Sequence, residues 1–117
     1  MPSVFDSTEI EVTTEQAAEA LASHGAQVVD VRERYEWDEG RLDGVAHIEM
    51  ERLASNAEKI DRERPVIFYC RLGSRSAFAA QAFRRAGYDA YSMAGGIQRW
   101  ADEFRPMVPE GATVADH

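Results

Sequence analysis

Cysteine is nearly absent from this chain: Cys70 is the only one among 117 residues. A single thiol cannot form an internal disulfide, which is consistent with a reducing compartment. The histidines and carboxylates show no metal-ligand spacing with it. The Gly-Gly pair, Gly95 and Gly96, lacks the Lys-Ser/Thr of a phosphate-binding loop. We therefore expect no disulfide scaffold, no metal and no cofactor.

Basic residues and long apolar runs are also scarce. The chain has 13 Lys and Arg against 21 Asp and Glu, a net charge of −8, which argues against nucleic acid or an anionic membrane as a partner. No apolar run approaches the roughly 20 residues that span a bilayer, and residues 1–12 lack the basic and apolar regions of a secretory signal. The expected location is the cytoplasm. A small anionic ligand stays compatible, because clustered arginines can outweigh the net charge at short range.

What the sequence does contain is a regular alternation of strand-like and helix-like segments. Hydrophobic residues make up 44% and charged residues 29% of the chain, which fits one globular domain. This alternation predicts an α/β fold, in which βαβ units build a mostly parallel sheet with helices on both faces. Strand patterns lie at residues 10–12, 27–31, 44–48, 66–69 and 89–93, and helix patterns at residues 15–22, 33–39, 50–57, 76–86 and 97–104.

Local signals set the boundaries of this domain. Thr13 and Gln16 form the pattern of a capping box and predict the start of the first helix. Residues 1–8 are expected to be a lead-in, residues 9–105 the domain, and residues 106–117 a largely unpacked tail with two prolines and little periodicity.

The loop that begins at Cys70 has the composition of an anion-binding site. Cys70 directly follows the apolar residues 66–69, which should form a central strand, and ligands of parallel sheets bind at such strand ends. The first N–H groups of the next helix lack partners, and Gly73 lets the backbone curl around an anion. With Arg71 and Arg75, these donors should hold an exposed Cys70 as a thiolate and bind an oxyanion. The alternative is a small buried hydrophobic residue next to two solvated arginines.

The histidines do not complete a hydrolase site. None lies in the Cys70 loop; His24 and His117 are expected to face solvent, and His47 to be structural. A cysteine–histidine catalytic pair is therefore weakly supported.

Asp30, Arg32 and Glu36 form a second group of charges, after the apolar strand at residues 27–31. Charges at the end of an apolar strand need partners. We interpret them as a buried or half-buried ion-pair network that fixes the loops near the site. Direct participation in catalysis is the alternative.

Three segments of the sequence carry a family resemblance. They are residues 29–32 followed by Glu36 and residues 40–45, residues 69–76, and residues 95–97 with Trp100. In this order and spacing, across about residues 9–105, they resemble the rhodanese family in its single-domain form. The resemblance implies a sheet of about five parallel strands with helices on both faces, and a sulfurtransferase activity.

The same resemblance implies roles for the loop. Cys70 attacks the outer sulfur of thiosulfate or a similar donor, sulfite leaves, and Cys70 carries a persulfide. A thiol, cyanide or a protein acceptor then takes that sulfur. Because no second cysteine is present, turnover depends on an external acceptor. The residues expected to surround the substrate are Arg71, Leu72, Gly73, Ser74 and Arg75.

Other functions stay open at this point. Cysteine phosphatases use Cys-x5-Arg, whereas Cys70 and Arg75 have the shorter Cys-x4-Arg spacing. A sulfur carrier would hand the persulfide from one protein to another with little small-molecule turnover. A non-catalytic interaction module would need neither a persulfide nor turnover, and the intact Cys70 loop argues against such a module.

Overall fold

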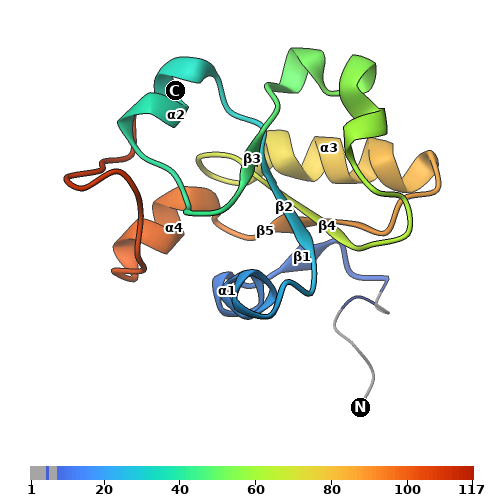
Figure 1. Ribbon diagram of the computed structural model, residues 1–117, viewed down its shortest axis with the longest axis horizontal. Coiled ribbons are helices and arrows are strands. Elements are labelled where there is room, and N and C mark those ends of the chain that lie inside the picture. The colour runs from blue at the N-terminus through green and yellow to red at the C-terminus, as the bar shows by residue number, and fades with distance from the viewer. Residues whose placement is uncertain (1–4, 6–7) are drawn as a thin grey trace.

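A five-stranded parallel sheet forms the centre of the molecule (Figure 1). The computed structural model describes Phe5 and residues 8–117, so most of the predicted lead-in lies outside the described residues. The strand order is β1-β5-β4-β2-β3, and all neighbouring strands are parallel. The predicted α/β fold is confirmed. The strands are β1 Glu11–Val12, β2 Gln27–Asp30, β3 Ala46–His47, β4 Val66–Tyr69 and β5 Ala90–Met93.

Helices cover both faces of this sheet. Their bounds are α1 Thr14–Ser23, α2 Arg34–Glu39, α3 Ser74–Arg85 and α4 Gly96–Asp102, with 3-10 segments η2 Met50–Arg52 and η3 Ala54–Lys59. α1 and α4 pack on one face, while α3 and the 3-10 segments pack on the other (Figure 1). The short helix α2 follows the carboxyl end of β2.

Strand β4 lies in the middle of the sheet because it is apolar along its whole length. All four of its residues are buried, and it pairs with β2 on one side and β5 on the other. Side chains of a strand alternate between the two faces. Ile67 and Tyr69 therefore join the core under α1 and α4, while Phe68 and Cys70 join the core under α3. This alternation decides on which face the sulfur lies.

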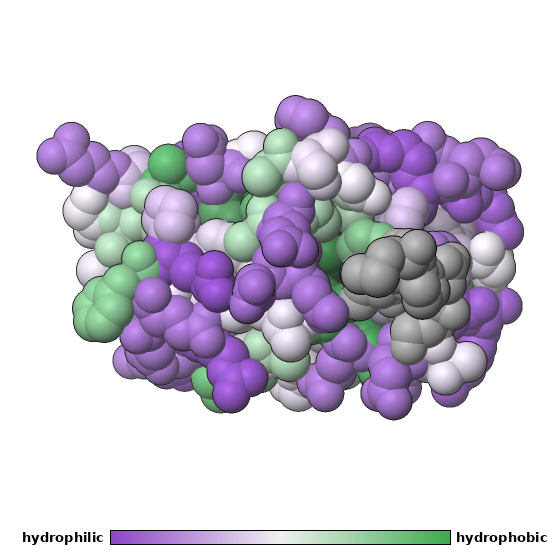
Figure 2. Space-filling model, turned by 90° about the horizontal axis from the view of Figure 1, so that it is seen from below, coloured by the Kyte–Doolittle hydropathy of each residue, from purple (hydrophilic) through white to green (hydrophobic). Residues whose placement is uncertain are grey.

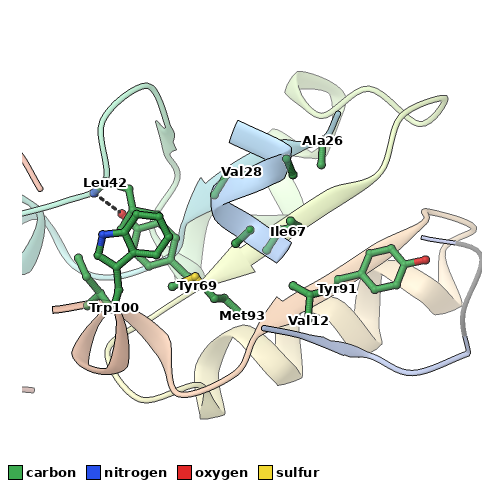
Figure 3. Packing of buried hydrophobic residues seen from close by; sticks show 12 residues of the cluster. Val12, Ala26, Val28, Leu42, Ile67, Tyr69, Tyr91, Met93 and Trp100 are labelled. Atoms are coloured by element: carbon green, nitrogen blue, oxygen red, sulfur yellow. Dashed lines mark hydrogen bonds between the residues drawn. The ribbon is translucent and has the colours of Figure 1, made fainter. Parts of the chain in front are cut away.

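The core under α1 and α4 also reaches the loop after α2. Figure 3 shows Tyr69 pointing toward Trp100 and Leu42. The Leu42 N–H donates a hydrogen bond of 3.2 Å to the Tyr69 hydroxyl. Because Tyr69 precedes Cys70, this bond ties the carboxyl end of β4 to a distant loop.

The surface outside α1 and α4 is mostly polar. Figure 2 shows hydrophilic residues over most of this face, with smaller hydrophobic areas between them. α1 turns Ala17 and Ala20 toward the sheet instead. In the described part of the chain, no helix has the length and apolar character needed to cross a membrane.

The helix predicted at residues 50–57 is wrong in type. The structure has the two 3-10 segments there, and Asn56 has φ −118° and ψ 17° inside the second. Side chains compete for the backbone at this point: Ser55 Oγ and Asn56 Nδ2 both donate to the Arg52 carbonyl. Such local bonds favour turns over a continuous α-helix.

The prediction of an unpacked tail at residues 106–117 is also wrong. Met107 and Val114 pack against the core under α1 and α4. Arg41 and Val108 exchange two backbone hydrogen bonds of 2.9 and 2.8 Å, and the Thr113 N–H donates to the Glu39 carbonyl at 2.9 Å. The partners of the tail come from the α2–β3 region, which local periodicity cannot reveal.

Gly40 provides a test of this packing. A Cβ at Gly40 would collide with the Thr113 carbonyl and with the Met107 and Ala112 side chains. Gly40→Ala should therefore lower the free energy of unfolding by about 1–3 kcal/mol, as overpacking does, measured by urea denaturation. Gly25→Ala is the matched control, because its Cβ meets only Ser23 Oγ at 3.1 Å and the Ala20 Cα at 3.9 Å. Equal stability of the two variants would contradict the packing of the tail against Gly40.

Candidate active site around Cys70

The loop between β4 and α3 curls its backbone around the sulfur of Cys70. Gly73, at φ 114°, precedes the first residue of α3. Its N–H donates to Cys70 Sγ at 3.1 Å, and the Ser76 N–H lies 3.5 Å from the same atom. These donors stand at the amino end of a 12-residue helix, whose dipole also favours an anion. The arrangement suits a sulfur that carries negative charge.

Ser76 is a contact of the sulfur that the sequence argument did not identify. Its hydroxyl lies 3.5 Å from Cys70 Sγ, donates to the Gly73 carbonyl at 3.2 Å and shares a 2.7 Å hydrogen bond with Ser92 Oγ. The only signal was its place in the segment at residues 69–76. A helical serine is common, and its contact with the sulfur depends on the curl of the loop.

The amino end of α4 holds the loop from behind. The Ile97 N–H donates to the Cys70 carbonyl at 2.9 Å, and the Gln98 N–H to the Arg71 carbonyl at 3.0 Å. Gly96, at φ 61°, leaves no room for a side chain, because a Cβ there would overlap both carbonyl groups. Gly96, the second residue of the glycine pair noted in the sequence, therefore allows close packing between two loops.

Cys70 is more deeply placed than expected. From the sequence we expected the thiol to be exposed at the rim of the sheet, but Cys70 is 1% exposed. The reason is the alternation along β4, which turns this side chain into the core under α3. Cys70 nevertheless borders a cavity of about 130 Å³. The cavity is lined by Cys70, Arg71, Leu72, Ser74, Arg75 and His117.

Arg75 binds Glu36 with two hydrogen bonds. Its Nη1 and Nη2 donate to the two carboxylate oxygens at 2.8 and 3.0 Å, and the Glu36 side chain is fully buried. Burial alone would raise the pKa of Glu36, but the hydrogen bonds from Arg75 and the Glu33 N–H, with the charge of Arg75, bring that pKa below its ordinary value. The hydrogen bonds with Glu36 likewise raise the pKa of Arg75. This pair joins α2 to the start of α3.

Asp30 and Arg32 form a separate buried pair. Arg32 Nη2 lies 2.7 Å from Asp30 Oδ2 and also donates to the Gly40 carbonyl at 2.7 Å, with both charged side chains fully buried. Burial would lower the pKa of Arg32, but the hydrogen bond and charge of Asp30 raise it. Among the described residues, Arg32 Nη1 has no hydrogen-bond partner. These charges thus form two separate ion pairs, Asp30 with Arg32 and Glu36 with Arg75. From the sequence we expected a single network.

The histidines take different places. His24 is exposed at the end of α1. His47 stacks on Trp37 at 4.6 Å, and its Nε2 lies 2.7 Å from the Arg32 carbonyl oxygen. His117 is exposed, as expected, but it also lines the Cys70 cavity.

Asp116 and His117 bring the end of the tail to the site. Arg71 Nη2 lies 3.2 Å from Asp116 Oδ1, and His117 Nε2 lies 3.2 Å from Glu33 Oε2. Arg71 Nε is buried and has no partner among the described residues. The sequence gives no local signal for these contacts, since both residues lie far along the chain from Cys70.

A cation site is poorly supported by the same residues. In the described part of the chain, Glu33, Glu36 and His117 bring possible ligand atoms within 4.8 Å of one another. However, both oxygens of Glu36 already accept hydrogen bonds from Arg75. The guanidinium therefore takes the place that a metal would need.

Known proteins are similar to this chain in sequence and in fold. The chain is 37% identical over 83 residues to the probable adenylyltransferase/sulfurtransferase MoeZ of Mycobacterium tuberculosis, covering 68% of this chain but only 21% of that protein. It is 31% identical over 86 residues to the thiosulfate sulfurtransferase GlpE of Coxiella burnetii, covering 73% of this chain and 80% of GlpE. The crystal structure of a rhodanese-related protein from Thermoplasma volcanium superimposes with a TM-score of 0.78 at 26% identity, covering 84% of this chain and 96% of that one.

A family model covers most of the fold. The model described as a rhodanese-like domain matches residues 13–103, which run from the cap of α1 to the end of α4. That range includes the whole Cys70 loop and the Gly96 turn behind it. By sequence and by fold, the chain belongs to the rhodanese-like domain family.

Proposed function

We propose that the protein is a sulfurtransferase that carries a sulfane sulfur as a persulfide on Cys70. The observation that supports this most directly is the convergence of the Gly73 and Ser76 N–H groups and the Ser76 hydroxyl near one sulfur atom. Relatives in the same family are named sulfurtransferases. Thiosulfate or a similar anion is the proposed donor.

The reaction has two halves. In the first, the Cys70 thiolate attacks the outer sulfur of thiosulfate. A bond forms between Sγ and that sulfur, the sulfur–sulfur bond of thiosulfate breaks, and sulfite leaves with the electron pair. In the second, a thiolate, cyanide or a protein acceptor attacks the outer sulfur of the persulfide, and the Cys70 thiolate is released. Charge balances in both halves, and a thiol that is already ionised needs no general base.

The size of the cavity fits this chemistry. Its volume of about 130 Å³ is below the roughly 300–1,000 Å³ of typical small-molecule pockets. A persulfide adds one sulfur atom to Cys70, and the nearby N–H donors can hold the negative charge of that atom. A bulky substrate would have to react from outside the cavity.

Phosphatase chemistry is less well supported. A cysteine phosphatase needs its loop arginine to face a tetrahedral phosphate, whereas both terminal nitrogens of Arg75 donate to buried Glu36. Negligible hydrolysis of p-nitrophenyl phosphate is therefore expected. Hydrolysis of that ester, without reaction with thiosulfate, would contradict the sulfurtransferase proposal.

A sulfur carrier is the second candidate, and Leu72 favours it. This apolar side chain borders the Cys70 cavity and is 60% exposed. An exposed apolar residue at the mouth of a site can contact a protein acceptor. Fast turnover with cyanide or a small thiol would favour the enzyme, whereas sulfur loading without such turnover would favour the carrier.

Persulfide formation gives the direct test. Intact mass after treatment with thiosulfate should show the gain of one sulfur atom, because Cys70 is the only thiol. Cys70→Ser should fold, as circular dichroism can show, and should gain no sulfur. Equal sulfur gain by Cys70→Ser, or no gain by the unaltered protein with any sulfane donor, would refute the proposal.

Ser76→Ala tests the role of the donors. The variant loses a hydroxyl that lies 3.5 Å from Sγ and donates to the carbonyl of Gly73, whose N–H binds Sγ; a neutral hydrogen bond contributes about 0.5–1.5 kcal/mol. The rate of persulfide formation should fall by roughly 2- to 10-fold. Ser23→Ala is the control, since Ser23 is exposed on α1 and does not line the Cys70 cavity. A folded Ser76→Ala variant that loads sulfur at the normal rate would show that the hydroxyl does not contribute.

A further inference from the structure

The end of the tail reaches the Cys70 cavity: His117 lines it, and Asp116 pairs with Arg71, which also lines it. We call residues 113–117 the C-terminal strap. Thr113 is fixed to the Glu39 carbonyl and Val114 packs against the core. The Tyr35 hydroxyl donates to the Asp116 carbonyl at 3.1 Å. Figure 1 shows this end of the chain beside α2. The strap therefore has a defined position next to the site.

The strap changes the charge of the site. From the sequence we expected Arg71 and Arg75 to bind an anionic substrate, yet each arginine already faces a carboxylate. Arg75 binds Glu36, and Arg71 Nη2 lies 3.2 Å from Asp116 Oδ1. An adjoining cavity of about 260 Å³ adds further carboxylates, and it is lined by Val31, Glu33, Glu49, Met50, Glu51, Arg75 and His117. The approach to Cys70 is thus not strongly cationic.

The Arg75–Glu36 and Arg71–Asp116 ion pairs differ in burial and in number of hydrogen bonds. Glu36 is fully buried and accepts two hydrogen bonds, whereas the Asp116 side chain is 99% exposed and has one contact with Arg71. Exposed pairs contribute little to stability. Arg71 also keeps a buried Nε without a partner among the described residues. An incoming anion can therefore bind Arg71 in competition with Asp116.

We propose that Asp116 is a specificity-determining residue, an internal competitor for Arg71 that disfavours small dianionic sulfur donors relative to donors of lower charge. This inference rests on the proposed function, since it names the class of donor that the same site accepts. A dianion such as thiosulfate must displace the Asp116 carboxylate and approach close to it. A donor with one negative charge or none meets less repulsion. The strap thus lowers the preference of the site for thiosulfate relative to an alkyl or protein-bound persulfide, while thiosulfate stays a donor that can load Cys70.

Alkylation of Cys70 tests the charge effect without sulfur chemistry. Iodoacetate and iodoacetamide have similar size and differ by one negative charge. In Asp116→Asn, the rate with iodoacetate should rise roughly 3- to 10-fold, the range expected when one charge near the site is removed, while the rate with iodoacetamide stays within about twofold. Because Asp116 is exposed, this variant should fold, which thermal melting checks.

A matched control removes the same charge elsewhere in the tail. Glu110 is exposed and its carboxylate makes none of the ion pairs found in the described residues, so Glu110→Gln should leave both alkylation rates unchanged. The effect of Asp116→Asn should also shrink in an Arg71→Met background. An equal rise with both reagents would indicate removal of a steric barrier and would overturn the proposal, as would an equal effect of Glu110→Gln.

Sulfur transfer separates this inference from the proposed function. In Asp116→Asn the apparent KM for thiosulfate should fall roughly 3- to 10-fold with kcat unchanged. If persulfide forms but neither KM nor the alkylation ratio changes, the inference about Asp116 fails and the sulfurtransferase function stands. If the alkylation ratio changes but no sulfane donor loads Cys70, the proposed function fails and the charge effect stands without a role in sulfur transfer.

Discussion

The Cys70 loop can turn its N–H groups toward one sulfur atom because its carbonyl groups are satisfied from behind. A peptide group carries one donor and one acceptor, and both need partners when buried. Ile97 and Gln98 provide N–H groups for the carbonyls of Cys70 and Arg71. This contact requires two backbones to touch, and only glycine at position 96 permits it. The position of the Cys70 loop therefore depends on a turn far from it in sequence.

Little of the positive charge around Cys70 is free to bind an anion. Both loop arginines face carboxylates, one buried and one exposed. Stabilisation of an anion at Cys70 must then come largely from N–H groups and the amino end of α3. Such fixed dipoles keep their position whatever the ligand. The buried pair of Arg75 and Glu36 acts mainly through geometry, because it joins α2 to the helix that carries the donors.

Local patterns predicted the central strand and the place of the Cys70 loop between that strand and the next helix. The strand at residues 66–69 has the predicted bounds, and the capping box of Thr13 and Gln16 begins α1. The pattern at residues 50–57 was misread, because the side chains of Ser55 and Asn56 bind the backbone instead of allowing an α-helix. Such competition depends on side-chain geometry and not on hydrophobic period.

Most of the other features that were missed from the sequence are made by contacts between distant segments. The packed tail, the place of His117 at the cavity and the pairing of Asp116 with Arg71 join the end of the chain to elements far along it. The depth of Cys70 was also missed, because parity along β4 and the covering helix together decide it. No single segment carries that information.

The sheet ends on each side in a strand of only two residues, β1 and β3. Long edge strands offer a row of unpaired backbone groups to which a second molecule can add. Here each border presents very little backbone for such growth. In the described part of the chain, the sheet therefore gives little opportunity for edge-to-edge growth, even though its middle strand is entirely apolar.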